Sequence, residues 1–118
     1  MEMHLRNYAY IGDAVWELFV REHTINKTQN SMDLHKMTTE RVKASFQAHL
    51  LQTIDSELSE EERDLIRRGR NLSVPVARRS NQAEYRQATA FEALIGWCYI
   101  ENRERLEYFL KIFKEKIE

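Results

Sequence analysis

The scarcity of helix-breaking residues is the strongest constraint on what this chain can fold into. Its 118 residues include only three glycines and one proline. No stretch shows the alternation of apolar and polar residues that is typical of a half-buried strand, whereas apolar residues recur at helical spacing over most of the length. We therefore predict an all-α fold, a helical bundle formed as one domain over residues 1–118.

The predicted helices follow these apolar periods and the signals that start and stop a helix. They cover about 5–24, 31–37, 39–54, 60–69, 81–101 and 103–117, and residues 69–80 form the one substantial predicted loop. Ser31 and either Thr38 or Thr39 are the predicted N-caps of the second and third helices. The predicted core face of the first helix carries Ile11, Ala14, Val15, Leu18 and Phe19.

Composition places the chain among soluble globular proteins. Apolar residues make up 42% and charged residues 31% of the sequence, which is the balance of a folded domain. No run of 18 apolar residues predicts a membrane span, and the N-terminus lacks the pattern of a signal peptide. The single cysteine, Cys98, excludes an internal disulfide and is interpreted as a core residue of a cytoplasmic protein.

Positive charge is concentrated in one segment of an otherwise nearly neutral chain. The net charge is −1, yet residues 63–79 hold six arginines against one acid, Asp64, for a local charge of +5. A basic segment on a neutral protein predicts a localised anionic partner.

Two acidic residues stand in apolar helical segments. Asp13 lies in YIGDAVWELFV, and Glu92 lies in TAFEALIGW among small residues. A carboxylate among apolar groups is costly unless it is paired, hydrogen-bonded or bound to a metal. If the two helices pack side by side, the repulsion between the acids favours a divalent cation, and a set of oxygen ligands suits Mg²⁺ or Mn²⁺. From the spacing alone, the alternative that each acid caps a helix or pairs with an arginine stays open.

The same two segments resemble the signature helices of the ribonuclease III family. The aspartate lies in an apolar–Leu/Ile–Gly–Asp–Ala/Ser motif, and the glutamate lies in a Phe/Val–Glu–Ala–Leu–Ile–Gly motif. A closer resemblance, to the compact bacterial branch called Mini-ribonuclease III, is carried by DLHKMTTERVKASFQA (33–48), RRGRN (67–71) and YRQATAFEALIG (85–96). The resemblance covers nearly the whole chain and implies a ribonuclease III endonuclease domain that forms a two-fold homodimer.

Carried over residue by residue, the resemblance implies that Asp13 is the catalytic aspartate and Glu92 the metal-binding glutamate. Both are expected to bind Mg²⁺, with Mn²⁺ as a substitute. Larger family members carry further acids where this chain has Arg6, Ala9 and Thr89. These departures resemble the compact branch, which works with a reduced set of acids.

The compact branch also lacks the double-stranded-RNA-binding domain of its larger relatives, so the catalytic domain itself is expected to hold RNA. Phosphates and 2′-hydroxyls are the expected contacts, because A-form RNA is recognised largely through them. Tyr10 aligns with the family's aromatic residue that inserts into the partner subunit. The predicted RNA-binding residues are His35, Lys36, Arg67, Arg68, Arg70, Arg78 and Arg79.

The resemblance implies a magnesium-dependent endoribonuclease that cleaves double-stranded RNA and leaves 5′-phosphate and 3′-hydroxyl ends. It further implies maturation of the ends of the large-subunit (23S) ribosomal RNA precursor in the cytoplasm, where a ribosomal protein could present the substrate. Two alternatives stay open. One is a non-catalytic, ribosome-associated RNA-binding relative; the other is an all-α nucleotide pyrophosphohydrolase, suggested by the spacing of Glu61 and Asp64.

Overall fold

The computed structural model describes residues 3–118 and is helical throughout, with no strand in that range. The all-α prediction is therefore confirmed. In chain order the helices are α1 (Leu5–Thr24), α2 (Ser31–Val42), α3 (Ala44–Thr53), the short 3₁₀ helix η1 (Asp55–Glu57), α4 (Glu60–Arg70), the 3₁₀ helix η2 (Val76–Asn81), α5 (Gln82–Glu101) and α6 (Arg103–Ile117).

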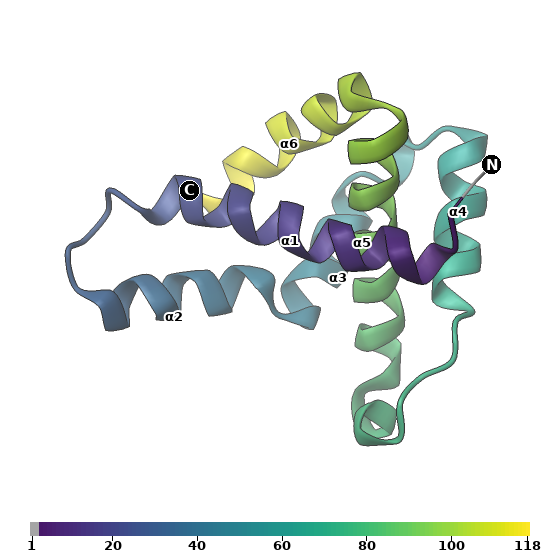
Figure 1. The fold of residues 1–118 in the computed structure, drawn as a ribbon, viewed down its shortest axis with the longest axis horizontal. Helices are drawn as coiled ribbons and strands as arrows, with labels where there is room; N and C mark the ends of the chain where they lie inside the picture. The colour runs from purple at the N-terminus through teal and green to yellow at the C-terminus, as the bar shows by residue number, and fades with distance from the viewer. Residues whose placement is uncertain (1–2) are drawn as a thin grey trace.

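Helix α5 is the central element of the bundle. It runs vertically through Figure 1, with α1 crossing it, and it also packs against α3, α4 and α6. Between residues 88 and 98 every residue of α5 is buried except Glu92. A helix that is apolar on all sides is stable only when neighbours surround it. The one acid in this stretch is therefore placed where the surrounding helices leave an opening.

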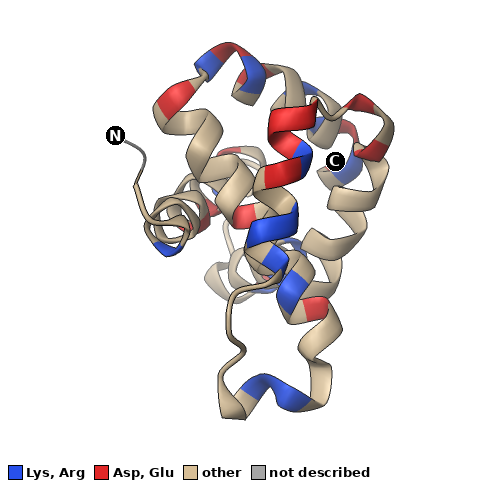
Figure 2. Ribbon diagram, turned by 90° about the vertical axis from the view of Figure 1, so that its right-hand side faces the viewer, with Lys and Arg blue, Asp and Glu red and all other residues tan. Residues whose placement is uncertain are grey.

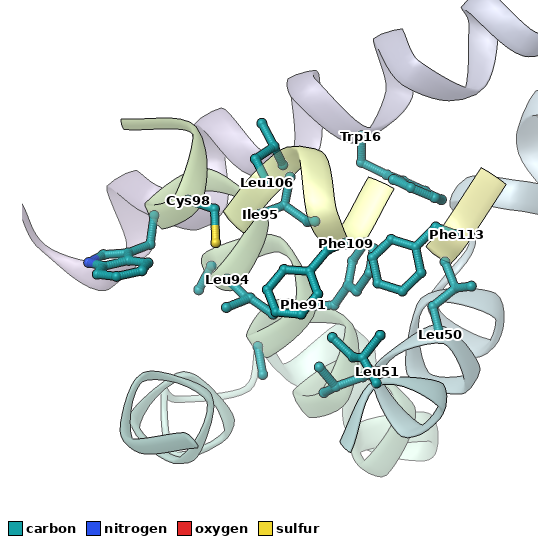
Figure 3. Packing of buried hydrophobic residues seen from close by; sticks show 14 of the residues in the cluster. Trp16, Leu50, Leu51, Phe91, Leu94, Ile95, Cys98, Leu106, Phe109 and Phe113 are labelled. Carbon is teal, nitrogen blue, oxygen red and sulfur yellow. The ribbon is translucent and has the colours of Figure 1, made fainter. Parts of the chain in front are cut away.

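An aromatic cluster joins the crossing helices in the core. The Trp16 ring of α1 lies edge-on to Phe91 of α5 and to Phe113 of α6, with ring centres 5.2 and 5.7 Å apart (Figure 3). Leu50 of α3 and Phe109 of α6 complete this side of the cluster. These contacts fix the position of α1 across α5.

The predicted core face of α1 was only partly correct, because Val15 and Phe19 pack half-buried against the core whereas Leu18 does not. Its buried residues are Tyr8, Gly12, Trp16, Val20 and Thr24, spaced four apart along one face. Leu18, which the sequence placed in the core, is 61% exposed, and Ala14 is exposed as well. Helix α1 has apolar residues on two faces, and the period alone does not identify which face meets the core.

The predicted boundary between the second and third helices was also wrong. Helix α2 continues to Val42, and Asn30 rather than Ser31 caps its start by accepting hydrogen bonds from two backbone amides. The break falls at Lys43, whose extended backbone (φ −68°, ψ 156°) ends α2 and begins α3. The carbonyl of Arg41 in the last turn of α2 accepts a hydrogen bond from Trp16 Nε1 at 2.9 Å, so α1 holds the end of α2.

The remaining boundaries agree with the sequence to within two residues, with one exception in the loop. Residues 71–75 are irregular, but η2 occupies the second half of the predicted loop. Helix α4 begins with a capping box, in which Ser59 and Glu62 bond each other's backbone amides. No helix among the described residues is long and apolar enough to cross a membrane.

Candidate active site

Two glycines allow the backbones of α1 and α5 to touch where they cross. A Cβ atom on Gly12 would lie 1.8 Å from the carbonyl oxygen of Glu92, and a Cβ atom on Gly96 would lie 1.8 Å from the carbonyl oxygen of Tyr8. Any side chain at either position would therefore push the helices apart. Asp13 follows directly after one of these glycines, so the close crossing brings its carboxylate to Glu92.

The two predicted catalytic acids do meet. Asp13 and Glu92 line one cavity of about 160 Å³. Its other lining residues are Arg6, Ala9, Tyr10, Tyr85 and Thr89. Thr89 is 8% exposed and precedes Glu92 by three residues, so both lie on the same face of α5. The cavity thus combines two carboxylates, a hydroxyl and a guanidinium at the helix crossing.

The environment of Glu92 opposes its ionisation. Burial of the side chain, the charge of Asp13 and a hydrogen bond with the Asp13 side chain together raise the pKa of Glu92 to about 8. Without a cation, this carboxyl group therefore keeps its proton at neutral pH. A divalent cation bound by the two groups would oppose this shift, because it supplies the missing counter-charge.

The donors in the cavity fit Mg²⁺ or Mn²⁺. Magnesium is commonly held by one or two carboxylates, with water and substrate phosphate oxygens completing its coordination. Asp13 and Glu92 supply that number, and the described residues contain no group of three or more His, Cys, Asp or Glu side chains that could hold a metal. Among the described residues, the cavity thus offers two carboxylates for such a cation.

Arginines of α1 and α5 bind the loop that follows α4. From α1, Arg6 Nη2 donates to the carbonyl oxygen and the hydroxyl of Ser73 at 3.1 and 2.8 Å. From α5, Arg86 Nη1 donates to the carbonyl oxygens of Arg70 and Leu72 at 2.7 and 3.3 Å. Residues 70–73 are thereby fastened beside the cavity.

The predicted RNA-binding arginines fall into two groups. Figure 2 shows α4 with an acidic first turn and a basic second half, and a separate basic segment at η2. In the α4 group, Asp64 holds Arg67 at 2.5 Å and Arg68 at 3.0 Å. Asp64, whose spacing from Glu61 suggested a pyrophosphohydrolase, is thus paired with arginines of its own helix. Arg70 is exposed at the end of the helix.

The η2 group is linked to the cavity through one aromatic ring. The Arg78 guanidinium lies over the Tyr85 ring, 5.4 Å from its centre, and Tyr85 lines the cavity. Arg79 is exposed beside it. The sequence did not single out Tyr85, although its position one helical turn before Thr89 places it on the same face of α5.

His35 and Lys36 lie elsewhere. Both are exposed on α2 and line hollows that contain neither Asp13 nor Glu92. Helix α2 forms a hairpin with the end of α1 at the left of Figure 1, away from the lower end of α5. The structure therefore does not join these two residues to the acidic cavity.

Several known proteins are similar to this chain. A family model described as the ribonuclease III domain matches residues 6–103. Curated proteins called Mini-ribonuclease 3 are similar: that of Gloeobacter violaceus is 43% identical over 96% of this chain and 84% of its own length, and that of Clostridium tetani is 43% identical over 88% and 72%. The crystal structure of a Fusobacterium nucleatum protein superposes with a TM-score of 0.84 at 29% identity, covering 98% of this chain and 94% of that one.

Proposed function

Because this chain belongs to the ribonuclease III domain family and is an endoribonuclease of that family, we propose that it cleaves double-stranded RNA at Asp13 and Glu92 with Mg²⁺. The observation that carries the proposal is the meeting of these two carboxylates in one cavity at the glycine-lined helix crossing. Bound Mg²⁺ would supply a Lewis acid for the phosphodiester and lower the pKa of water for hydrolysis.

Each side chain of the cavity has a part in this proposal. Asp13 and Glu92 approach from separate helices and would supply the two carboxylates that hold the cation. The Thr89 hydroxyl can donate to or accept from a neighbouring water. Arg6 sits on the rim and adds positive charge where a phosphate group approaches the acids. Tyr85 carries the cavity wall toward the arginines of η2.

RNA binding is assigned to the arginine segment of α4 and η2. Its fastening by Arg6 and Arg86 supports this assignment, because a loop held in place loses little conformational entropy on binding. Arginine also pairs well with phosphate oxygens. Arg79 and Arg70 are exposed and ready for such contacts, whereas Arg67 and Arg68 would first exchange Asp64 for a phosphate.

We also propose a two-fold homodimer formed through α1. Tyr10 is 82% exposed, Leu18 is 61% exposed, and exposed Ala14 lies midway between them on the same helix face. A stripe of exposed apolar side chains is typical of a protein interface. Tyr10 also lines the acidic cavity, so a partner on this stripe would border the site.

The proposed natural substrate is the 23S ribosomal RNA precursor in the cytoplasm, with a ribosomal protein as an optional presenting partner. The resemblance to the compact branch supports this choice. The test is cleavage of the precursor, alone and assembled with ribosomal proteins, followed by mapping of the new 5′ ends. Ends that do not coincide with those of mature 23S RNA would contradict the choice of substrate.

The activity itself is tested with a labelled RNA duplex. We expect cleavage by the wild type in Mg²⁺, none in EDTA, and a loss of at least about 100-fold in Asp13→Asn and Glu92→Gln, since each removes one of the two carboxylates. Both variants should still bind the duplex. Wild-type rates in Asp13→Asn would refute the assignment, and binding without any cleavage by the wild type would favour the non-catalytic relative.

A further inference from the structure

A buried amide lies against the carboxylate of Glu92. Gln47, on α3, is 1% exposed, and its Nε2 donates to Glu92 Oε2 at 3.5 Å. Glu92 is thus approached from two sides, by Asp13 of α1 and by Gln47 of α3. No function was predicted for Gln47 from the sequence.

Burial of this amide needs an explanation. A side-chain amide moved from water into an apolar core costs on the order of 1–3 kcal/mol unless it is hydrogen-bonded. Among the described residues, Glu92 is the one hydrogen-bond partner that the structure gives the Gln47 side chain. The neighbouring core positions of α3 are Leu50 and Leu51. A leucine at position 47 would suit this face, so the amide points to a purpose at Glu92.

We propose that Gln47 is a positioning residue of the cation site, holding one oxygen of the Glu92 carboxylate on the core side so that the other faces Asp13. This inference rests on the proposed function, because it presumes that Glu92 binds the cation. Gln47 does not line the acidic cavity, whereas Asp13, Thr89 and Glu92 do. Its amide therefore lies behind Glu92 as seen from the cavity, where it can orient the carboxylate without touching the cation.

The chemistry of an amide suits this position better than a charge. A lysine or arginine here would neutralise Glu92 and compete with a divalent cation for it. A carboxylate would add a third negative group beside two that already repel each other. The amide donates a hydrogen bond to the ionised carboxylate yet leaves its charge available.

The test measures Mn²⁺ binding to RNA-free protein by electron paramagnetic resonance. Gln47→Leu and Gln47→Met both remove the donor at similar volume. We expect each to raise the dissociation constant for Mn²⁺ on the order of 10-fold or more, as is typical when a group behind a metal ligand is lost. The control is Thr38→Val, at a buried polar position of α2 that is 8% exposed and does not line the acidic cavity. This variant should leave the dissociation constant for Mn²⁺ unchanged.

The outcomes separate this inference from the proposed function. If Asp13→Asn binds Mn²⁺ as the wild type does, the proposed cation site is refuted, and the proposed role of Gln47 is refuted as well. If Asp13→Asn loses Mn²⁺ but both Gln47 variants bind normally, only the role of Gln47 is refuted.

A second measurement needs no variant at Gln47, and so it holds even if those variants do not fold. The ¹H–¹⁵N resonances of the Gln47 side-chain amide should shift during a Mg²⁺ titration of the wild type. The same resonances should stay fixed in Asp13→Asn. Resonances that do not move in the wild type at saturating Mg²⁺ would overturn the inference.

Discussion

Replacing Gly12 with alanine is expected to separate the two helices that carry Asp13 and Glu92. The added Cβ would lie 1.8 Å from the Glu92 carbonyl oxygen and 2.8 Å from the backbone nitrogen of Gly96. Real Cβ atoms essentially never approach another heavy atom within 3.0 Å, so α1 and α5 must move by about 1.2 Å along that contact. The clash is with backbone, so no rotamer change can relieve it.

The structure sets the sign and scale of the effect. In an exposed helix, glycine to alanine stabilises by about 1 kcal/mol. Overpacking in a core costs about 1–3 kcal/mol and occasionally more, and this clash is at the severe end. We expect Gly12→Ala to destabilise the fold by about 3 kcal/mol and to lower the melting temperature by roughly 10 °C. A displacement of about 1 Å at a catalytic group also costs on the order of 100-fold in rate.

The assay combines thermal unfolding with RNA-duplex cleavage in Mg²⁺, and Gly69→Ala is the matched control. There the new Cβ would lie 3.0 Å from Ala90 Cα and 3.4 Å from Ala90 Cβ, a tight contact that a small shift relieves. Gly69→Ala should change stability by no more than about 1 kcal/mol and retain its activity. A Gly12→Ala protein with wild-type stability and rate would refute the close crossing as the device that brings the acids together.

Three further changes test separate parts of the structure. Because the pKa of Glu92 is raised from its usual 4.5 to about 8, the folded state binds the extra proton between those values. The free energy of unfolding of the metal-free wild type should therefore fall as pH rises through that range, by at most about 5 kcal/mol. In urea unfolding, Glu92→Gln should lack this pH-dependent loss. Identical pH profiles of the two proteins would contradict the raised pKa of Glu92. Arg105→Ala should lower the free energy of unfolding in denaturant by about 3–5 kcal/mol, because it leaves the buried Glu62 carboxylate, which Arg105 holds at 2.8 Å, without its partner. A loss below about 1 kcal/mol would refute this role of Arg105. If the proposed dimer forms through the α1 stripe, Leu18→Glu should sediment as a monomer and the wild type as a dimer. A sedimentation coefficient equal to that of the wild type would exclude the stripe as the interface.

Glu62 and Glu92 are both acids in the interior of the fold, but their surroundings differ. Burial raises the pKa of the Glu62 carboxyl, but the two hydrogen bonds from Arg105 and the bond from the Ser59 amide outweigh it and hold that pKa below its ordinary value. Glu92 has a neutral amide and a second carboxylate as neighbours instead. The first acid has its counter-charge within the chain, whereas the second lacks one until a cation binds.

Much of the fold could be predicted from the sequence, because helix starts and stops are local. The helices predicted over 60–69 and 103–117 match α4 (Glu60–Arg70) and α6 (Arg103–Ile117) to within one residue. The orientation of α1 was not predictable in this way. It depends on which of two apolar faces meets α5, and Gly12 decides this through a contact with a residue 80 positions away.

The site was only partly predictable for the same reason. Asp13 and Glu92 stand out as acids in apolar helices, and the family motif identifies both. Gln47 was hidden because the predicted helix ran unbroken through Lys43, whereas α3 begins at Ala44 and buries Gln47 together with Leu50 and Leu51. With that break known, a glutamine among core leucines would have been the signal.

The most direct test of the acidic pair as a cation site is anomalous X-ray scattering from crystals grown with Mn²⁺. We expect one strong peak between the carboxylates of Asp13 and Glu92, within about 2.0–2.3 Å of an oxygen of each, since a compact divalent cation bonds carboxylates at about that distance. The peak should disappear in crystals of Glu92→Gln. A Mn²⁺ peak elsewhere, with the two carboxylates in contact and no density between them, would contradict the site.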